Sequence, residues 1–332
     1  MSDLIQRLSA VEDPFLEVTL CELNAISSES GGTFVSLPTA VYPERALLEE
    51  RVKAAAGGEP VQIREKQGAG TASIIAVGSG KGGVGKSTVA ATLAFALREL
   101  GASVGLLDAD VYGPSIPHMF GATGKPAVMQ VPVGNGQVAE RLVPIERHGV
   151  RMISMGFMVD PDQAVVWRGP MVHRALTQFL QQTAWGDLDY MIVDMPPGTG
   201  DVALTLSQQS GLAGAVVVCT PQKVALLDAG KAINMYAQVN IPLLGVVENM
   251  TGEMFGRGGA RTKADEMGVA FLGELEALPS VRELSDEGRV HEIVAEGSSM
   301  REPLMALANN VVRRAALAEM SRVELPSLET DG

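Results

Sequence analysis

The sequence feature that most constrains the fold is the glycine-rich run Gly80-Lys81-Gly82-Gly83-Val84-Gly85-Lys86-Ser87-Thr88. A short apolar stretch, 74–77, precedes this run, and a stretch with helical apolar spacing, 89–100, follows it. A strand, a glycine loop and a helix in this order point the first helical amides at a bound phosphate, and glycines avoid Cβ clashes there. The whole run therefore predicts a nucleotide phosphate site, in which Lys86 reaches the β and γ phosphates and Ser87 binds Mg²⁺.

A second lysine, Lys81, follows the first glycine of the run, which is unusual for a phosphate-binding loop. Because Lys86 already serves the nucleotide of its own chain, Lys81 is placed to neutralise charge that develops during phosphoryl transfer on the nucleotide of a facing subunit. The alternative is a solvated lysine without a catalytic role. The first interpretation predicts a homodimer in which each Lys81 acts on the partner's nucleotide.

Acidic residues stand at the ends of two further apolar stretches. Asp110 follows one of them and Asp194 ends the other. Since open α/β sheets bind ligands at the carboxyl ends of their strands, we predict that Asp110 orients the attacking water and that both carboxylates, with Ser87, hold Mg²⁺. Gly198, in the loop after Asp194, is the candidate sensor of the γ-phosphate, because hydrolysis would release a contact made by its amide. As isolated strand-end residues, the two aspartates would instead be interpreted as caps.

A candidate for reading the base is Asn249, which follows another apolar stretch and could bond the base through its amide. A strand-end turn residue is the alternative. Residues 262–265, Thr-Lys-Ala-Asp, resemble the guanine-reading motif of GTPases, but they open a helical stretch, 261–267, instead of following a strand. We therefore interpret them as a solvated helix face and expect adenine, and hence ATP, as the nucleotide.

From residue 73 onward, apolar strands alternate with amphipathic helices. This pattern predicts an α/β fold with a doubly wound, mostly parallel sheet covered by helices on both faces. Residues 121–149 form an irregular insertion or a hairpin. The expected strands are 104–107, 150–154, 191–193, 215–219, 243–247 and 270–275, and the expected helices are 170–183, 202–210, 225–239 and 303–320.

The N-terminal part, residues 1–65, is expected to form a separate small α+β domain. The next segment, 66–72, has the glycine-rich composition of a linker. The nucleotide-binding domain would then span 73–320, followed by an acidic tail, 321–332. The elements expected in the small domain are helices at 5–11 and 46–56 and strands at 17–26 and 33–37.

Composition weighs against several classes of partner. The formal net charge is −13 and the pI is near 4.8, which opposes non-specific binding to nucleic acid or to an anionic membrane. No apolar run approaches the roughly 20 residues of a membrane span, and the start of the chain has no basic segment followed by an apolar one. We therefore expect a cytoplasmic protein without nucleic-acid or membrane partners.

The loop with two lysines resembles the deviant phosphate loop of the MinD/ParA/Mrp class of dimeric ATPases. Further runs make residues 73–320 similar to the Mrp/ApbC group of iron–sulfur cluster carrier ATPases. The resemblance implies a MinD-like P-loop NTPase fold, slow ATP hydrolysis by a homodimer, and assembly of a cluster or its transfer to apoprotein clients, with assembly factors as partners. The N-terminal unit weakly resembles the small assembly-factor domain often fused ahead of such ATPases. The runs that carry the resemblance are 110–115, 154–157, 167–171, 194–201, 220–222 and 248–250.

The chain departs from this family at the residues that would hold iron. The family carries a Cys-x-x-Cys pair shortly after Glu-Asn-Met, because thiolates bind cluster iron. Here the segment 251–256 reads Thr-Gly-Glu-Met-Phe-Gly, and Tyr42 stands where the related small domain commonly has cysteine. Only Cys21 and Cys219 remain, and the four histidines show no ligand spacing. We therefore expect no conventional set of iron–sulfur ligands in this chain.

Three functions remain open at this point. The first is an ATPase of iron–sulfur cluster assembly that uses unconventional ligands or a ligand-bearing partner. The second is a positioning or partitioning ATPase of the MinD/ParA sort, against which the acidic charge weighs. The third is a nucleotide-gated interaction switch that has no cluster of its own.

Overall fold

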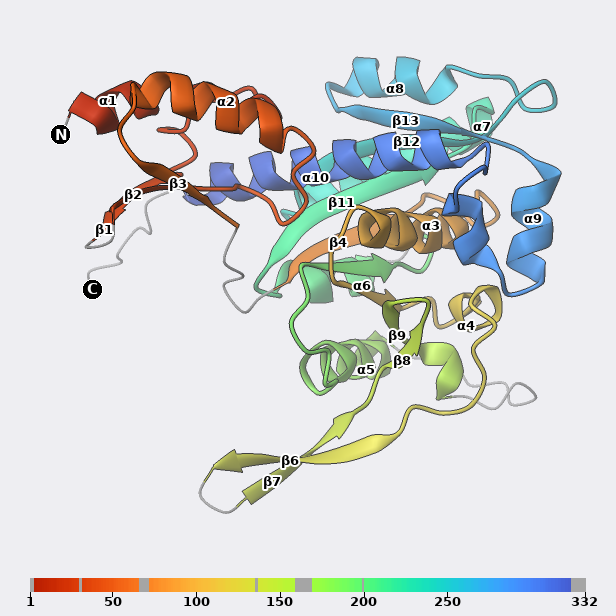
Figure 1. Cartoon of the computed structure of the whole chain (residues 1–332). Coiled ribbons are helices and arrows are strands. Elements are labelled where there is room, and N and C mark those ends of the chain that lie inside the picture. The colour runs from red at the N-terminus through yellow and green to blue at the C-terminus, as the bar shows by residue number, and fades with distance from the viewer. Residues whose placement is uncertain are drawn as a thin grey trace, which may run out of the picture. The chain divides into compact units, whose positions relative to one another are not determined.

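The computed structural model describes residues 3–29, 32–65, 72–134, 137–158, 169–198 and 200–323. The chain divides into two compact units, one of residues 1–69 with 312–332 and one of residues 70–311 (Figure 1). The boundaries expected from the sequence stay predictions. Residues 66–71 of the expected linker 66–72, residues 324–332 of the expected tail 321–332, residues 167 and 168 of the 167–171 run, and Thr199 lie outside the described residues. Among the described residues, no helix has the length and apolarity that crossing a bilayer demands.

The small unit packs two helices against a three-stranded sheet. Its strands lie in the order β1-β2-β3, with β1 and β2 antiparallel and β2 and β3 parallel. Leu8 of one helix and Leu48 and Val52 of the other are buried in one core with Val35 of the sheet. The elements are α1 (Asp3–Ser9), β1 (Ile26–Glu29), β2 (Gly32–Ser36), α2 (Arg45–Ala56) and β3 (Val61–Arg64).

The strand expected at 17–26 is wrong, because this segment is a series of turns before β1. Glu17 and Asn24 have positive φ values of 60° and 48°, which a strand does not allow. The turns start at the buried Asp13, whose carboxylate accepts the main-chain N–H groups of Phe15 and Leu16 at 2.9 and 2.7 Å. A buried side chain thus satisfies amides that a strand ladder would otherwise use.

The large unit is built on an eight-stranded sheet in the order β13-β12-β11-β4-β10-β5-β9-β8. All neighbours are parallel except β8 and β9, which confirms the mostly parallel sheet expected from the sequence. Each expected strand is present, with ends shifted by a few residues. The strands are β4 (Ser73–Gly78), β5 (Val104–Asp108), β8 (Ile145–Arg147), β9 (Val150–Ser154), β10 (Tyr190–Asp194), β11 (Leu212–Cys219), β12 (Leu243–Thr251) and β13 (Phe271–Glu276).

Helices flank this sheet. One core cluster joins α5, α6, α7 and α8 to alternate residues of the strands, such as Ile74 and Ala76 of β4. Helix α3, which follows the glycine loop, contacts β4, β5 and β10. The helices are α3 (Lys86–Glu99), α4 (Ile116–Met119), α5 (Gly169–Gln181), α6 (Gly200–Ser207), α7 (Lys223–Gln238), α8 (Gly259–Met267) and α9 (Pro279–Asp286), with 3-10 turns η1 (Met155–Phe157) and η2 (Val290–Val294). The last helix, α10 (Arg301–Val323), belongs to the large unit up to residue 311 and to the small unit from residue 312.

The insertion at 121–149 contains a hairpin, one of the two forms expected. Strands β6 (Val128–Gly134) and β7 (Gln137–Leu142) pair antiparallel, with Val131 opposite Ala139. The base of β7 is tied to the end of α5, because the Leu142 N–H donates to the Gln182 carbonyl at 2.9 Å.

Two histidines stack on each other where the β8–β9 turn meets η2. The rings of His148 and His291 lie 3.5 Å apart between centroids and 12° from parallel, and both lie near Phe95 of α3. Burial, and then the nearby His148, lower the pKa of His291 below its usual 6.5, although Glu292 opposes this and Arg289 adds to it. The fold therefore favours the neutral ring over the protonated one.

This stack predicts that acid destabilises the large unit. Since the folded state binds the His291 proton less well than the unfolded chain does, the free energy of unfolding should fall as the pH drops through about 6.5. Urea unfolding at about pH 7.5 and about pH 5.5 measures the change. The variant His291→Phe keeps a ring against His148 and should show a smaller decrease. An equal decrease in both proteins would contradict the prediction.

Candidate functional site

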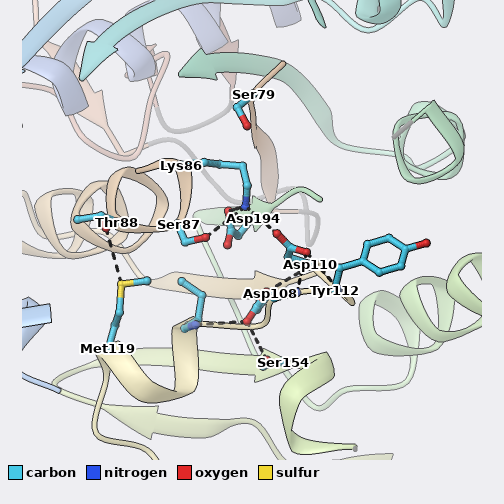
Figure 2. Close-up of polar contacts among 12 residues, drawn as sticks. Ser79, Lys86, Ser87, Thr88, Asp108, Asp110, Tyr112, Met119, Ser154 and Asp194 are labelled. Atoms are coloured by element: carbon cyan, nitrogen blue, oxygen red, sulfur yellow. Dashed lines mark hydrogen bonds and ion pairs between the residues drawn. The ribbon is translucent and has the colours of Figure 1, made fainter. Parts of the chain in front are cut away.

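The carboxyl ends of three adjacent strands bring the predicted phosphate-binding residues together. Strand β4 leads into the glycine loop, β5 leads to Asp110, and β10, which lies between them, ends at Asp194. Lys86, at the start of α3, lies between the two acids: its Nζ is 2.5 Å from Asp194 Oδ1 and 3.5 Å from Asp110 Oδ2 (Figure 2). The same ammonium lies 3.2 Å from Ser87 Oγ.

These charges are buried. Lys86 is 6% exposed, Asp110 7% and Asp194 not at all. Burial raises the pKa of Asp194, and the Lys86 ammonium opposes that rise. Asp194 Oδ2 is buried without a hydrogen-bond partner, so this carboxylate has an unused oxygen beside the loop. Burying these charged groups costs free energy that their mutual pairing only partly offsets. Such buried charges beside a pocket are typical of a site that binds a charged ligand.

Asp108 belongs to this site as well, although sequence reasoning assigned it no role. It is paired in register with Asp194 across β5 and β10 and is fully buried. Burial, and then the charge of Asp194, raise the pKa of its carboxyl. Its Oδ1 accepts the Asp110 N–H at 3.1 Å. The sequence gives one sign of it: an aspartate lies two residues before Asp110. From the pattern alone, this residue is interpreted as the ordinary end of a strand.

A pocket of about 280 Å³ opens beside Lys86. Seven residues of the predicted loop line it, together with Asp110, whereas two others face elsewhere. Gly80 lies against α7, since a Cβ there would be 2.0 Å from the Asp228 carbonyl oxygen. Val84 is buried, and its carbonyl accepts the Asn249 side-chain amide at 2.9 Å. The pocket is lined by Lys81, Gly82, Gly83, Gly85, Lys86, Ser87, Thr88 and Asp110, and also by Ser79, Gly113, Ser115, Met119 and Pro197.

A second pocket of about 570 Å³ adjoins the first, because Gly85 and Thr88 line both. Asn249 lies in its wall and donates one side-chain N–H to the Val84 carbonyl of the loop, and its base-reading role stays a prediction. Gly198 lies outside both pocket linings, and its N–H donates to the Ser79 carbonyl at 3.2 Å. Residues 262–265, the segment resembling a GTPase motif, lie in α8.

Gly85 is expected to tolerate no side chain. Its φ is +79°, and a Cβ would lie 2.2 Å from Asn249 Nδ2. Gly85→Ala should therefore displace Asn249 and lower the free energy of unfolding by about 1–3 kcal/mol. Gly82→Ala is the matched control, since a Cβ there meets nothing within 4 Å and its φ is not positive. Equal unfolding midpoints in urea for both variants would contradict this account.

The two cysteines lie in different units and differ in exposure. Cys21 is exposed in the small unit, and Cys219 is buried in β11 of the large unit. Burial, and then Glu248, raise the pKa of the Cys219 thiol to about 12, so that it stays protonated and unreactive. Among the described residues, no group of three or more His, Cys, Asp or Glu side chains is arranged to hold a metal ion.

Thiol labelling measures the difference in accessibility between Cys21 and Cys219. Iodoacetamide at pH about 8 should modify Cys21 rapidly in the native protein and Cys219 only after denaturation, because the thiolate is the reactive form. In Cys21→Ser, native labelling should disappear. Rapid native labelling of Cys219, seen by mass spectrometry, would show that β11 is accessible and would contradict the structure.

The segment that carries cysteines in the family is a closed turn here. Gly252 and Gly256 exchange two main-chain hydrogen bonds, of 3.1 and 2.7 Å. The buried Glu248 accepts the N–H groups of Gly258 and Gly259 at the start of α8, and Arg257 pairs with two glutamates of β13. These main-chain and side-chain contacts hold the turn against β12, β13 and the start of α8.

Three comparisons with known proteins find nucleotide-binding and iron–sulfur relatives of this chain. The family model of the ParA NUBPL iron-transfer P-loop NTPases matches residues 70–312. An iron–sulfur cluster carrier protein of Synechocystis sp. is 41% identical over 94% of this chain and 97% of its own length. A nucleotide-binding protein of Archaeoglobus fulgidus, solved in complex with ADP, is 39% identical, with a TM-score of 0.55 over 66% of this chain and 87% of that one.

The fold is shared more widely. The cell division ATPase MinD of Pyrococcus furiosus, 22% identical, has a TM-score of 0.54 over 73% of this chain and 98% of its own, which confirms the predicted MinD-like sheet. The family match covers the glycine loop, Asp110, Asp194 and Asn249 together. The chain therefore belongs to the ParA/NUBPL family of iron-transfer P-loop NTPases.

Proposed function

We propose that this protein binds ATP with Mg²⁺, hydrolyses it slowly as a homodimer, and uses the nucleotide cycle in transferring iron–sulfur clusters to apoprotein clients. The observation that carries the proposal is Lys86, buried between two carboxylates at the mouth of a pocket lined by glycines of the loop. The family match and the names of the carrier relatives support the cluster role.

The residues present fit a magnesium ion. Ser87 and Asp110 offer oxygen ligands in the lining of the first pocket. Asp194 is fully buried outside that lining, next to Lys86, and its Oδ2 has no hydrogen-bond partner, which leaves this oxygen available as a ligand. Mg²⁺ commonly takes only one or two carboxylates and completes its shell with phosphate oxygens and water, so a three-residue protein cage is not required. When bound, the ion would neutralise charge on the phosphates.

The chain's own groups then divide the work of hydrolysis. The loop amides and the start of α3 bind the phosphates, and Lys86 holds the β and γ groups. Asp110 orients the attacking water. In the described conformation Gly198 donates to the Ser79 carbonyl, so sensing the γ-phosphate requires its amide to exchange that carbonyl for phosphate oxygen.

The second pocket suits an adenine base. It continues from the phosphate pocket past Gly85 and Thr88 and is walled by apolar side chains such as Met250 and Phe255. Asn249 holds this wall to the loop. One N–H of its amide is used in this contact, so a base-reading role falls to the second N–H or to the side-chain oxygen.

A second copy of the chain is the partner that the surface near Lys81 supports. Among the described acids, none pairs with the Lys81 ammonium. Gly80 packs on the Asp228 carbonyl, which places α7 beside the loop, and the nearby Val224 and Leu227 of that helix are 64% and 66% exposed. Two exposed apolar side chains beside a cation that no described acid pairs with are what a nucleotide-bridged dimer would cover.

The cluster enters as cargo, and this chain lacks the thiols to hold it alone. Four iron ligands are needed, whereas each chain offers the exposed Cys21 and the protonated Cys219. We therefore assign cluster ligation to a client or assembly factor with its own cysteines. The alternative is a nucleotide-gated switch without cluster chemistry. A MinD/ParA-like positioning role stays a third candidate, disfavoured by the net charge of −13, and a cytoplasmic location stays a prediction.

Two measurements on the full chain test the proposal. Calorimetry with Mg²⁺ and ATP should show saturable binding that GTP does not match, and no heat with ATP would overturn the nucleotide assignment. The second measurement is anaerobic incubation with iron and sulfide. The chain alone should not retain the cluster, and with a cysteine-bearing apoprotein present the iron should end on the apoprotein, at a rate that ATP changes. Failure of ATP to alter transfer would favour the switch without cluster chemistry.

A further inference from the structure

Ser154 is a buried hydroxyl that the proposed mechanism does not yet use. It ends β9, next to β5 in the sheet, and none of its surface is exposed. Its Oγ donates to Asp108 Oδ2 at 2.8 Å (Figure 2). The same oxygen accepts the Gly156 N–H at 2.9 Å. Both hydrogen-bonding functions of the hydroxyl are therefore committed to fixed partners.

Asp108 connects Ser154 to the loop that follows β5. Besides Ser154, its carboxylate accepts the Asp110 N–H at 3.1 Å and the Ile116 N–H, at the start of α4, at 3.3 Å. One buried side chain thus joins both ends of the segment 110–116 to β9. A carboxylate with three donors has a fixed orientation, and so does the main chain that supplies two of them.

Asp110 sits inside the segment that is held in this way. Its Oδ1 accepts the N–H groups of Tyr112 and Gly113, each at 3.2 Å, and its Oδ2 faces Lys86 at 3.5 Å. The position of this carboxylate is set by its own main chain, which Asp108 anchors. Catalysis is sensitive to displacements below 1 Å, so the anchor matters for the water that Asp110 orients.

We propose that Ser154 is a positioning residue for hydrolysis: it orients Asp108, and through Asp108 it fixes the main chain that carries Asp110. This inference rests on the proposed ATPase function. Ser154 does not line either nucleotide pocket and does not touch the nucleotide site directly. Its loss should therefore affect the chemical step and leave nucleotide binding almost unchanged.

The kinetic test compares Ser154→Ala with a matched control. Ser154→Ala should lower kcat about tenfold and change the Kd for MgATP by less than about threefold. Thr205→Val removes another buried hydroxyl, which bonds the Asp201 carbonyl and His173 outside the site, and should leave kcat unchanged. Because Ser154 acts through Asp108, adding Ser154→Ala to Asp108→Ala should lower kcat no further than Asp108→Ala alone. Additive losses would overturn the proposal.

A second readout does not depend on turnover. The Asp110 and Ile116 amides are protected by Asp108, so hydrogen exchange of segment 109–117 in nucleotide-free protein should become faster in Ser154→Ala and not in Thr205→Val. Unchanged exchange in Ser154→Ala would overturn the proposal whether or not the protein hydrolyses ATP. Wild-type protein without turnover, but with the expected exchange, would refute the ATPase assignment and leave the anchor standing.

Discussion

Replacing Lys86 with alanine is expected to abolish nucleotide binding. The substitution removes the ammonium that faces the phosphate pocket, and charged hydrogen bonds contribute about 1.5–3 kcal/mol each. With both the β and γ phosphates affected, the affinity for MgATP should fall at least about 100-fold, and turnover should reach background. Calorimetry at the concentrations that saturate the wild-type protein measures the loss.

The same change in another helix serves as the control. Lys263, in α8, pairs with Glu266 and lies outside both pocket linings. Lys263→Ala should bind MgATP like the wild type, which also tests whether the GTPase-like motif at 262–265 is a helix face. If Lys86→Ala kept wild-type affinity, the phosphate site would have to lie elsewhere.

Replacing Lys81 with alanine is expected to separate hydrolysis from binding. No described acid holds this lysine, and its assigned role is to meet charge that develops on a neighbouring copy's nucleotide. Cations supplied across an interface to phosphoryl transfer contribute about 10³-fold or more to kcat. We expect Lys81→Ala to lose about that much turnover and to change the Kd for MgATP by less than about threefold.

Single-turnover hydrolysis and equilibrium binding, measured on the same preparation, decide this prediction. Lys81→Arg keeps the charge and should recover part of the rate. If Lys81→Ala lost binding to the same extent as Lys86→Ala, Lys81 would belong to its own nucleotide's site and the trans role would be wrong.

Local patterns were sufficient to predict the centre of the site. The glycine loop needs only the order of strand, glycines and helix, and Asp110 and Asp194 mark strand ends that a parallel sheet must bring to one edge. The roles of these residues remain predictions. Asp108 and Ser154 could not be predicted in the same way, because their partnership depends on β5 and β9 being neighbours, 46 residues apart in sequence.

The small unit shows where such patterns fail. Residues 17–26 contain apolar residues at a spacing that favours a strand, and Leu20 is indeed fully buried. A turn forms instead, because the carboxylate of Asp13 accepts the main-chain N–H groups of Phe15 and Leu16, just before this segment. The same carboxylate also accepts the Tyr42 hydroxyl at 2.6 Å. Such a turn depends on a partner 29 residues away, so no window of sequence around residue 20 contains the information.

The most direct test of the account mixes two inactive proteins. Lys81→Ala and Asp110→Asn should each hydrolyse ATP very slowly as homodimers, since each lacks one catalytic group at both sites. In a mixed dimer, the nucleotide bound by the Lys81→Ala chain keeps its own Asp110 and receives Lys81 from the partner. An equal mixture should therefore recover roughly a quarter of the wild-type rate, because half of the dimers are mixed and each has one complete site.

A mixture without activity would contradict the account. If Lys81 served the nucleotide of its own chain, no site in any dimer would be complete, and the mixture would stay as inactive as its parts. ATPase activity of the equal mixture is thus the deciding measurement: recovery to roughly a quarter of wild type supports a nucleotide held between two copies of this chain, and no recovery contradicts it.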